Sequence, residues 1–325
     1  MIRYLLRKLG YGFLILMGIN VLTFVLFFKV NTPDDMARMQ LGGKRVTPEA
    51  IEKWKSLRGY DQPLFFNENK SGAEQVTQTL FFKTSTQMMS FDFGRSDAGR
   101  DINEEILSRA GPSLALALPS FSIGMALSIL IALGLAFFRG SYLDFWGTVA
   151  CVVLMSISAL FFIVSGQFLL SKVLQWLPVS GFSVGADAWR FLIMPISIAI
   201  IASLGGQVRF NRAVFLEEID KDYVRTAKAK GLSDLQTLMR HVLPNGLIPI
   251  ISSSVAVIPL LFMGSLISES FFSIPGLGAY LIGAIGSQDF AIVRSMVFVG
   301  SVLYIFGLIL TDLCYAWADP RIRLS

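Results

Sequence analysis

The sequence is poor in charge. Only 16% of its 325 residues are charged and 54% are hydrophobic, whereas a soluble domain carries about 25% charged residues. Because such a chain lacks the polar surface that a soluble fold needs, we expect an integral membrane protein. The formal net charge of +5 does not indicate a nucleic-acid partner, since the basic residues lie mostly beside apolar runs, as in a membrane topology signal.

Histidine and cysteine are scarce as well. His241 is the only histidine, which excludes a histidine-based metal site or a Ser-His-Asp triad within this chain. The two cysteines, Cys151 and Cys314, lie in apolar runs and form no C-x-x-C pair, so we expect buried apolar side chains. No G-x-x-x-x-G-K-[ST] loop occurs, and the chain is not expected to bind ATP itself. We therefore predict no catalytic residue, metal or cofactor in this chain.

Long apolar runs are abundant. The first, residues 9–28, follows Arg3, Arg7 and Lys8. It is too long for the core of a cleaved signal peptide and ends without a small-residue cleavage site, so we predict a spanning helix with a cytoplasmic N-terminus. Most of the further runs have the roughly 20 residues that cross a bilayer. We predict an all-α polytopic membrane protein with six transmembrane helices, five or seven being alternatives; the further runs are 113–137, 145–170, 191–207, 247–268 and 293–316.

The chain between the first two runs has a different composition. Residues 31–110 carry both signs of charge and several turn signals, and Thr47-Pro48 is typical of a helix start. We predict an extracytoplasmic segment inserted after the first helix. The expected parts are therefore residues 1–30, 31–110 and a core membrane domain at 111–325.

The charge pattern predicts the orientation. With the N-terminus inside, the loop 208–245 is also inside, and it holds more basic than acidic residues. The C-terminal tail, with Arg321 and Arg323, is then cytoplasmic too. Both termini are expected in the cytoplasm.

The loop 208–245 contains a helix-ending signal. Lys228 and Lys230 fall in the last turn of a predicted helix, where cations suit the helix dipole. Gly231 follows, at the position where a left-handed residue commonly ends a helix. A sharp change of chain direction is expected there.

A second short helix is predicted directly afterwards. Ser233 and Gln236 form an S-x-x-Q capping box, so the helix should begin at Asp234 and end at Leu243-Pro244. It could lie on the bilayer or dock into a groove of a partner protein, because periodicity does not separate the two. The apolar stripe at helical spacing comprises Leu235, Leu238, Met239 and Val242.

This loop resembles that of binding-protein-dependent ABC importer permeases. Their motif runs E-A-A, three residues, Gly, nine residues, Ile, one residue, Leu-Pro. Arg225-Thr226-Ala227, Gly231, His241 and Leu243-Pro244 have this spacing, with Arg225 in place of Glu and His241 in place of Ile. The stretches 222–231, 240–245, 269–278 and 319–323 look like the dipeptide/oligopeptide branch.

The resemblance implies a type I permease fold and a mechanism. The loop would seat in a cleft of a separate ATPase, which binds ATP and Mg, so that ATPase dimerisation moves the permease helices. Implied partners are a second homologous permease, two ATPase subunits, an extracytoplasmic binding protein and membrane lipid in a bacterial inner membrane. The residues that it implies for the ATPase-coupling loop are Tyr223, Arg225, Thr226, Ala227, Ala229, Gly231, Leu232, Leu235, Leu238, Met239, His241, Leu243 and Pro244.

The implied substrate is a peptide, with nickel complexes, glutathione or another small solute as alternatives. An ion-coupled secondary transporter is a rival that would need buried acids in mid-span. Asp144 lies near a predicted cytoplasmic end and is expected to be hydrated or functional. Ser156 and Gln167 could line a pore or bond between helices.

The loop after the fifth run could be solvated or could gate the outer mouth. The same two alternatives, solvation at the interface or a role in gating, apply to Glu269, Asp289 and Arg294. The outer-loop candidates are Glu269, Phe272, Pro275, Gly276 and Gly278.

Overall fold

A computed structural model describes residues 2–42, 46–185, 187–255, 257–261 and 263–318. Cys314 lies outside the described side chains, and the 319–323 stretch with Arg321 and Arg323 lies outside the described residues. The described chain is helical, with one isolated bridge between Arg95 and Asp101, so the all-α prediction is confirmed. It divides into two compact units, residues 1–108 with 280–305 and residues 109–279 with 306–325.

The first unit is built on α1 (Ile2–Phe24), which continues as the π-helical turn η1 (Val25–Val30). Phe24 and Phe28 at its end pack with Met36, Trp54 and Leu80 of the 31–110 segment in an aromatic-rich core. Thr47 caps α3 through its side chain, as predicted, and Gly59 ends that helix in a left-handed conformation. The segment contains α2 (Pro33–Gln40), α3 (Pro48–Arg58), α4 (Glu74–Thr77) and α5 (Leu80–Met89).

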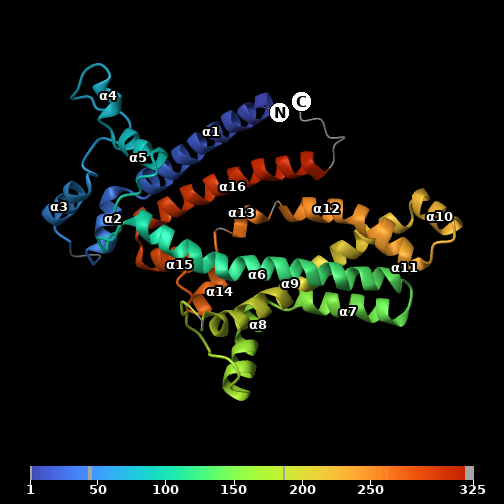
Figure 1. The fold of residues 1–325 in the computed structure, drawn as a ribbon. Coiled ribbons are helices and arrows are strands. Elements are labelled where there is room, and N and C mark those ends of the chain that lie inside the picture. The colour runs from blue at the N-terminus through green and yellow to red at the C-terminus, as the bar shows by residue number, and fades with distance from the viewer. Residues whose placement is uncertain (1, 43–45, 186, 256, 262, 319–325) are drawn as a thin grey trace. The chain divides into compact units, whose positions relative to one another are not determined.

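The second unit contains the short helices of residues 220–242 and several longer helices, some of which lie side by side in Figure 1. An apolar cluster of this unit joins α6, α7, α9 and α12 with the short helices between α9 and α12. The elements are α6 (Ile102–Phe137), α7 (Tyr142–Ser156), α8 (Ala159–Gly166), η2 (Gln167–Val173), α9 (Ala188–Ile219), α10 (Asp222–Ala229), α11 (Asp234–Thr237), η3 (Leu238–Val242), α12 (Leu243–Val255), α13 (Ile258–Leu261), α14 (Leu266–Phe271), α15 (Leu277–Ser287) and α16 (Phe290–Ala318), of which α6, α15 and α16 extend into the first unit.

Several predicted apolar runs are single long helices. Four described helices are long and apolar enough to cross a membrane: 6–30, 102–137, 188–219 and 290–313. The run at 145–170 is a helix pair bent by 91°, which makes a fifth span if counted as one. The bend lies at Ile157 and Ser158, both of which have extended backbone.

The remaining predicted run, 247–268, is not one helix. Its described part forms the end of α12, the short α13 and the start of α14. Gly264, with a φ of +75°, lies in the turn before α14. By length and composition, the described residues therefore support four spans, or five if the bent pair counts as one. We predicted six, with five or seven as alternatives, so the count agrees with the predicted range only when the bent pair is included.

Candidate functional site

The segment between α9 and α12, residues 220–242, forms a bent pair of short helices that we call the corner. A carboxylate at the end of α9 holds its start. Glu218, only 7% exposed, accepts hydrogen bonds from the Tyr223 hydroxyl and the Lys221 ammonium. Burial, reinforced by the bond to Glu218, raises the pKa of Tyr223, so the hydroxyl stays a donor. These bonds fix the direction in which the chain leaves α9.

The first corner helix, α10, is amphipathic. Val224 and Ala227 are buried at 2% and 5% exposure, with Val224 in the main apolar cluster of the unit. Arg225, Thr226 and Ala229 are exposed on its other side. Of the predicted coupling residues on this helix, Ala227 therefore fixes the helix to its own unit rather than facing outward.

The bend has the geometry that the sequence predicts. Gly231 has a φ of +88°. The Gly231 amide donates to the Lys228 carbonyl at 2.9 Å and the Leu232 amide to the Ala227 carbonyl at 3.3 Å, which is the Schellman pattern. Lys228 also pairs with Asp234 across the bend at 2.6 Å.

The second helix starts as predicted and ends differently. The Ser233–Gln236 capping box is present, and α11 begins at Asp234. Leu243-Pro244 does not end the helix: the chain passes through the π turn η3 directly into α12. Pro244 lies in the first turn of α12, where a missing amide hydrogen is tolerated, and the wider π turn directly precedes it.

The predicted apolar stripe is divided between two sides. Leu238 and Val242 are buried, at 6% and 1% exposure, in the core of the second unit. Leu235 and Met239 are exposed, at 58% and 49%. Leu238 is therefore mostly turned inward, and the exposed part of the stripe consists of Leu235 and Met239.

The last predicted residues of the loop lie where η3 joins α12. His241 and Leu243 are partly buried, as is Leu232 at the bend, and Pro244 is exposed. The His241 carbonyl accepts a hydrogen bond from the Asn245 side chain at 2.6 Å. The histidine thus lies within a structured turn.

An ion pair not foreseen from the sequence lies near the corner. Arg212 of α9 makes two bonds of 2.7 Å to the two carboxylate oxygens of Asp144 on α7. The Gly140 amide donates a third hydrogen bond to Asp144 at 3.0 Å. Asp144 is only 6% exposed, so the hydrated alternative is wrong; the pair ties the start of α7 to α9. Helical periodicity relates residues three or four positions apart, so it could not predict a pair 68 positions apart in the sequence.

Glu269 lies in a buried site built from backbone and small residues. It is 0% exposed and accepts hydrogen bonds from the Ser113 hydroxyl (2.8 Å), the Ser265 amide (3.0 Å) and the Ala279 amide (3.0 Å). A Cβ atom at Gly276 would lie 2.3 Å from a Glu269 oxygen. Glu269 is therefore an internal brace of the segment 265–279, and the solvated alternative is wrong.

The other outer-loop candidates surround this brace. Phe272 is 1% exposed and packs with Leu116 and Met194. Gly278 is buried, and a Cβ there would lie 2.8 Å from the Leu266 amide nitrogen, whereas Pro275 is exposed. The stretch 269–278 is thus mostly packed inside the second unit.

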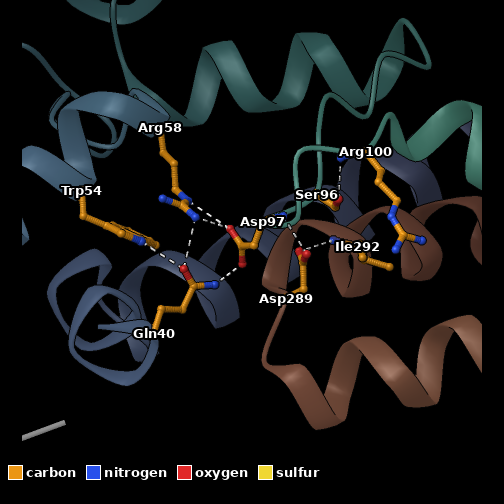
Figure 2. Close-up of polar contacts among 8 residues, drawn as sticks. All are labelled: Gln40, Trp54, Arg58, Ser96, Asp97, Arg100, Asp289 and Ile292. Carbon is orange, nitrogen blue, oxygen red and sulfur yellow. Dashed lines mark hydrogen bonds and ion pairs between the residues drawn. The ribbon is translucent and has the colours of Figure 1, made fainter. Parts of the chain in front are cut away.

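The first unit has its own buried carboxylate, shown in Figure 2. Asp289, 4% exposed, accepts hydrogen bonds from the amides of Asp97 at 2.7 Å and Ile292 at 3.3 Å. Burial raises the pKa of Asp289, and the nearby Asp97 charge adds to the effect. The alternative that Asp289 is solvated at the surface is therefore also wrong.

Asp97 is held in turn by a polar network. Arg58 pairs with Asp97 at 2.6 Å, stacks on Trp54 at 4.3 Å and donates to Gln40 at 3.2 Å, while Gln40 donates to Asp97 (Figure 2). The Trp54 indole donates to Gln40 at 3.0 Å. Through Asp97 and Asp289, this network joins helices α2 and α3 to the start of α16.

Known proteins with similar sequences are transport permeases that match this chain over almost its full length. A peptide transport system permease protein of Brucella abortus is 30% identical over 326 residues, and the match covers 98% of each chain. The glutathione transport system permease protein GsiC of Salmonella paratyphi A is 29% identical over 324 residues, covering 99% of each chain.

Two family models match this chain. Residues 1–104 match the N-terminal part of the membrane component of binding-protein-dependent transport systems. Residues 124–324, which include the corner and Glu269, match the inner membrane component itself. The chain therefore belongs to the inner membrane components of binding-protein-dependent transport systems, the permease subunits of ABC importers.

Proposed function

We propose that this chain forms half of a peptide translocation pathway and receives the work of ATP hydrolysis through the corner at 220–242. The peptide substrate is supported by the name of the Brucella relative, whose match covers 98% of each chain. The coupling role is supported by one observation above all. The corner is braced on one side by Val224, Leu238 and Val242, and it exposes Leu235 and Met239 on the other.

This arrangement is suited to transmitting force. The Schellman turn, the capping box and the Lys228–Asp234 pair make the bend rigid. η3 runs without a break into α12, and Glu218 holds the start of the corner at the end of α9. A partner that grips Leu235 and Met239 would therefore move α9 and α12 together, which suits a switch between two pore states.

The partners follow from the geometry of such a machine. One corner engages one ATPase, so a second homologous permease is needed for two ATPase subunits, and ATP and Mg bind on those subunits. A binding protein delivers substrate on the opposite side of the membrane. The corner and both termini lie in the cytoplasm, in keeping with the basic residues of 208–245.

Glutathione is a second candidate substrate. The similarity to the glutathione permease GsiC favours it, at nearly the same identity as the peptide permease. Glutathione has peptide-like amide groups, so one pathway could carry either. An uptake experiment in which unlabelled peptide and glutathione compete with labelled peptide distinguishes the two substrates.

Reconstituted transport tests the proposal. The chain is placed in proteoliposomes with its second permease, the ATPases and the binding protein, and uptake of a labelled tripeptide is measured. Uptake should require both ATP and the binding protein, and excess unlabelled tripeptide should compete better than glutathione. Uptake that persists without ATP would refute the coupling, and preferential competition by glutathione would refute the peptide assignment.

A further inference from the structure

The second unit contains two adjoining cavities that its packing leaves open. They have volumes of about 250 Å³ and 230 Å³ and lie between α6, α9 and the segment 253–268. Phe121, Gln207 and Val257 line both, so the two cavities adjoin, and together we call them the cleft. Ser156 and Gln167, which the sequence offered as pore candidates, do not line it. Ser156 donates to the Val152 carbonyl of its own helix, and Gln167 donates to the Val179 and Phe271 carbonyls.

The cleft is polar without being charged. None of the described residues that line either cavity is Asp, Glu, Lys or Arg. Hydroxyl groups come from all three sides, with Ser120 on α6, Ser203 on α9 and Ser254 on α12. A charged group would thus meet no charged side chain among the described lining residues; the Glu269 carboxylate lies behind Ser265 in the wall.

The polar groups of the cleft are mainly acceptors. Ser120, Ser203 and Ser254 each donate their hydroxyl hydrogen to a carbonyl of their own helix, at 2.7–3.1 Å. Each oxygen keeps lone pairs that can accept. Gln207 adds a stronger signal, because its Oε1 has no hydrogen-bond partner among the described residues. The oxygen is enclosed beside Gly124 of α6, so the side chain must turn to present it to the cleft. A buried carbonyl oxygen without a donor is destabilising.

These observations call for a ligand that brings N–H donors and apolar surface but no required charge. A peptide backbone carries one N–H and one C=O in each residue regardless of its side chains. We propose that this cleft is the part of the translocation pathway that this chain supplies, and that the Gln207 side chain, turned into the cleft, accepts through Oε1 from a main-chain N–H of the passing peptide. The inference rests on the proposed function and identifies where and how the substrate is held.

An uncharged lining has a consequence for the choice of peptide. Transport requires contacts favourable enough for entry and weak enough for release. Hydrogen bonds to the main chain meet this need without selecting a side-chain charge. The pathway is therefore tolerant of both acidic and basic peptides, and a charge introduced at residue 207 makes it selective.

The test is charge selectivity in proteoliposomes. Uptake of Ala-Glu-Ala is divided by uptake of Ala-Lys-Ala for wild type, for Gln207→Glu and for Gln175→Glu, an exposed loop position outside the cleft. Gln207→Glu should lower this ratio about fivefold, the effect of roughly 1 kcal/mol of like-charge repulsion. Gln175→Glu should leave the ratio unchanged.

A second variant keeps the inference testable if the introduced glutamate is protonated or disturbs assembly. The Ser203→Cys thiol should react with a water-soluble thiol reagent, and saturating tripeptide with binding protein and ATP should slow that reaction. An unchanged uptake ratio together with unprotected labelling would overturn the inference. If the wild-type complex took up neither peptide, the proposed function itself would fail, which is a separate outcome.

Discussion

At the scale of single residues, buried carboxylates organise this protein. Glu269, Asp144 and Asp289 are each 6% exposed or less, and each is satisfied by hydrogen bonds from segments distant in sequence. The sequence indicated that these acids lie near helix ends, but not what they bond. Ser113 and Glu269 are 156 residues apart, and no local pattern encodes such a pairing.

Replacing Glu269 with Gln should destabilise the protein. The amide group turns one acceptor into a donor that faces the Ser265 and Ala279 amides or the Ser113 hydroxyl. The expected loss is about 1–3 kcal/mol, seen as a lower melting temperature in detergent. Glu217→Gln, the same change at an exposed position of α9, is the control and should melt as wild type. Equal melting temperatures for both variants would contradict the brace.

Removing Arg212 should be more damaging than removing a neighbouring surface arginine. Arg212→Ala leaves the buried Asp144 carboxylate without its cation, a loss of about 3 kcal/mol. Arg209→Ala, on the exposed side of the same helix, is the matched control. The melting temperatures of the two variants are measured by thermal unfolding. If both fall by a similar small amount, the Arg212–Asp144 pair does not hold α7 to α9.

At the scale of elements, local signals predicted the corner well and its far end poorly. Gly231 and the Ser233–Gln236 box act within a few residues, so their patterns predicted both the bend and the helix start. The helix end at Pro244 was predicted wrongly, because a π turn allows the chain to continue. Which side of the stripe is buried depends on packing against the core, and periodicity alone could not separate Leu238 from Leu235.

The bend itself is open to a substitution series at Gly231. No atom lies within 4 Å of a Cβ built there, so the φ of +88° is the constraint rather than space. A β-branched residue is strained in this conformation, whereas Asn tolerates it. Gly231→Val should therefore uncouple ATP hydrolysis from peptide uptake, and Gly231→Asn should remain close to wild type. Normal transport by the Val variant would refute the role of the bend.

At the scale of the whole molecule, composition and hydropathy predicted the membrane class and the all-α fold. They did not predict the interruption in the 247–268 run or the 91° bend in the 145–170 run. Hydropathy measures transfer into lipid and does not record where the backbone turns. The family match covers both the N-terminal segment and the core, so both units belong to one transport subunit.

Stability of the first unit should depend on pH through Asp289. The raised pKa means that the folded chain binds this proton more tightly than the unfolded chain does. The resulting penalty is absent below the unfolded pKa of about 3.9. It grows as the pH rises and is complete above the raised, folded pKa. The melting temperature of wild type should therefore fall relative to Asp289→Asn as the pH is raised through this range. A difference that does not change with pH would contradict the assignment.

The central claim is that the corner contacts a separate ATPase, and cross-linking tests it most directly. Leu235→Cys is introduced into the assembled complex and treated with a short thiol-to-amine cross-linker, with Leu57→Cys, an exposed position in the 31–110 segment, as the control. We predict that the Leu235→Cys variant links to the ATPase subunit and that the Leu57→Cys variant does not. A Leu235→Cys variant that stays unlinked in a complex that hydrolyses ATP, or that is labelled by an impermeant reagent from outside the cell, would contradict the account.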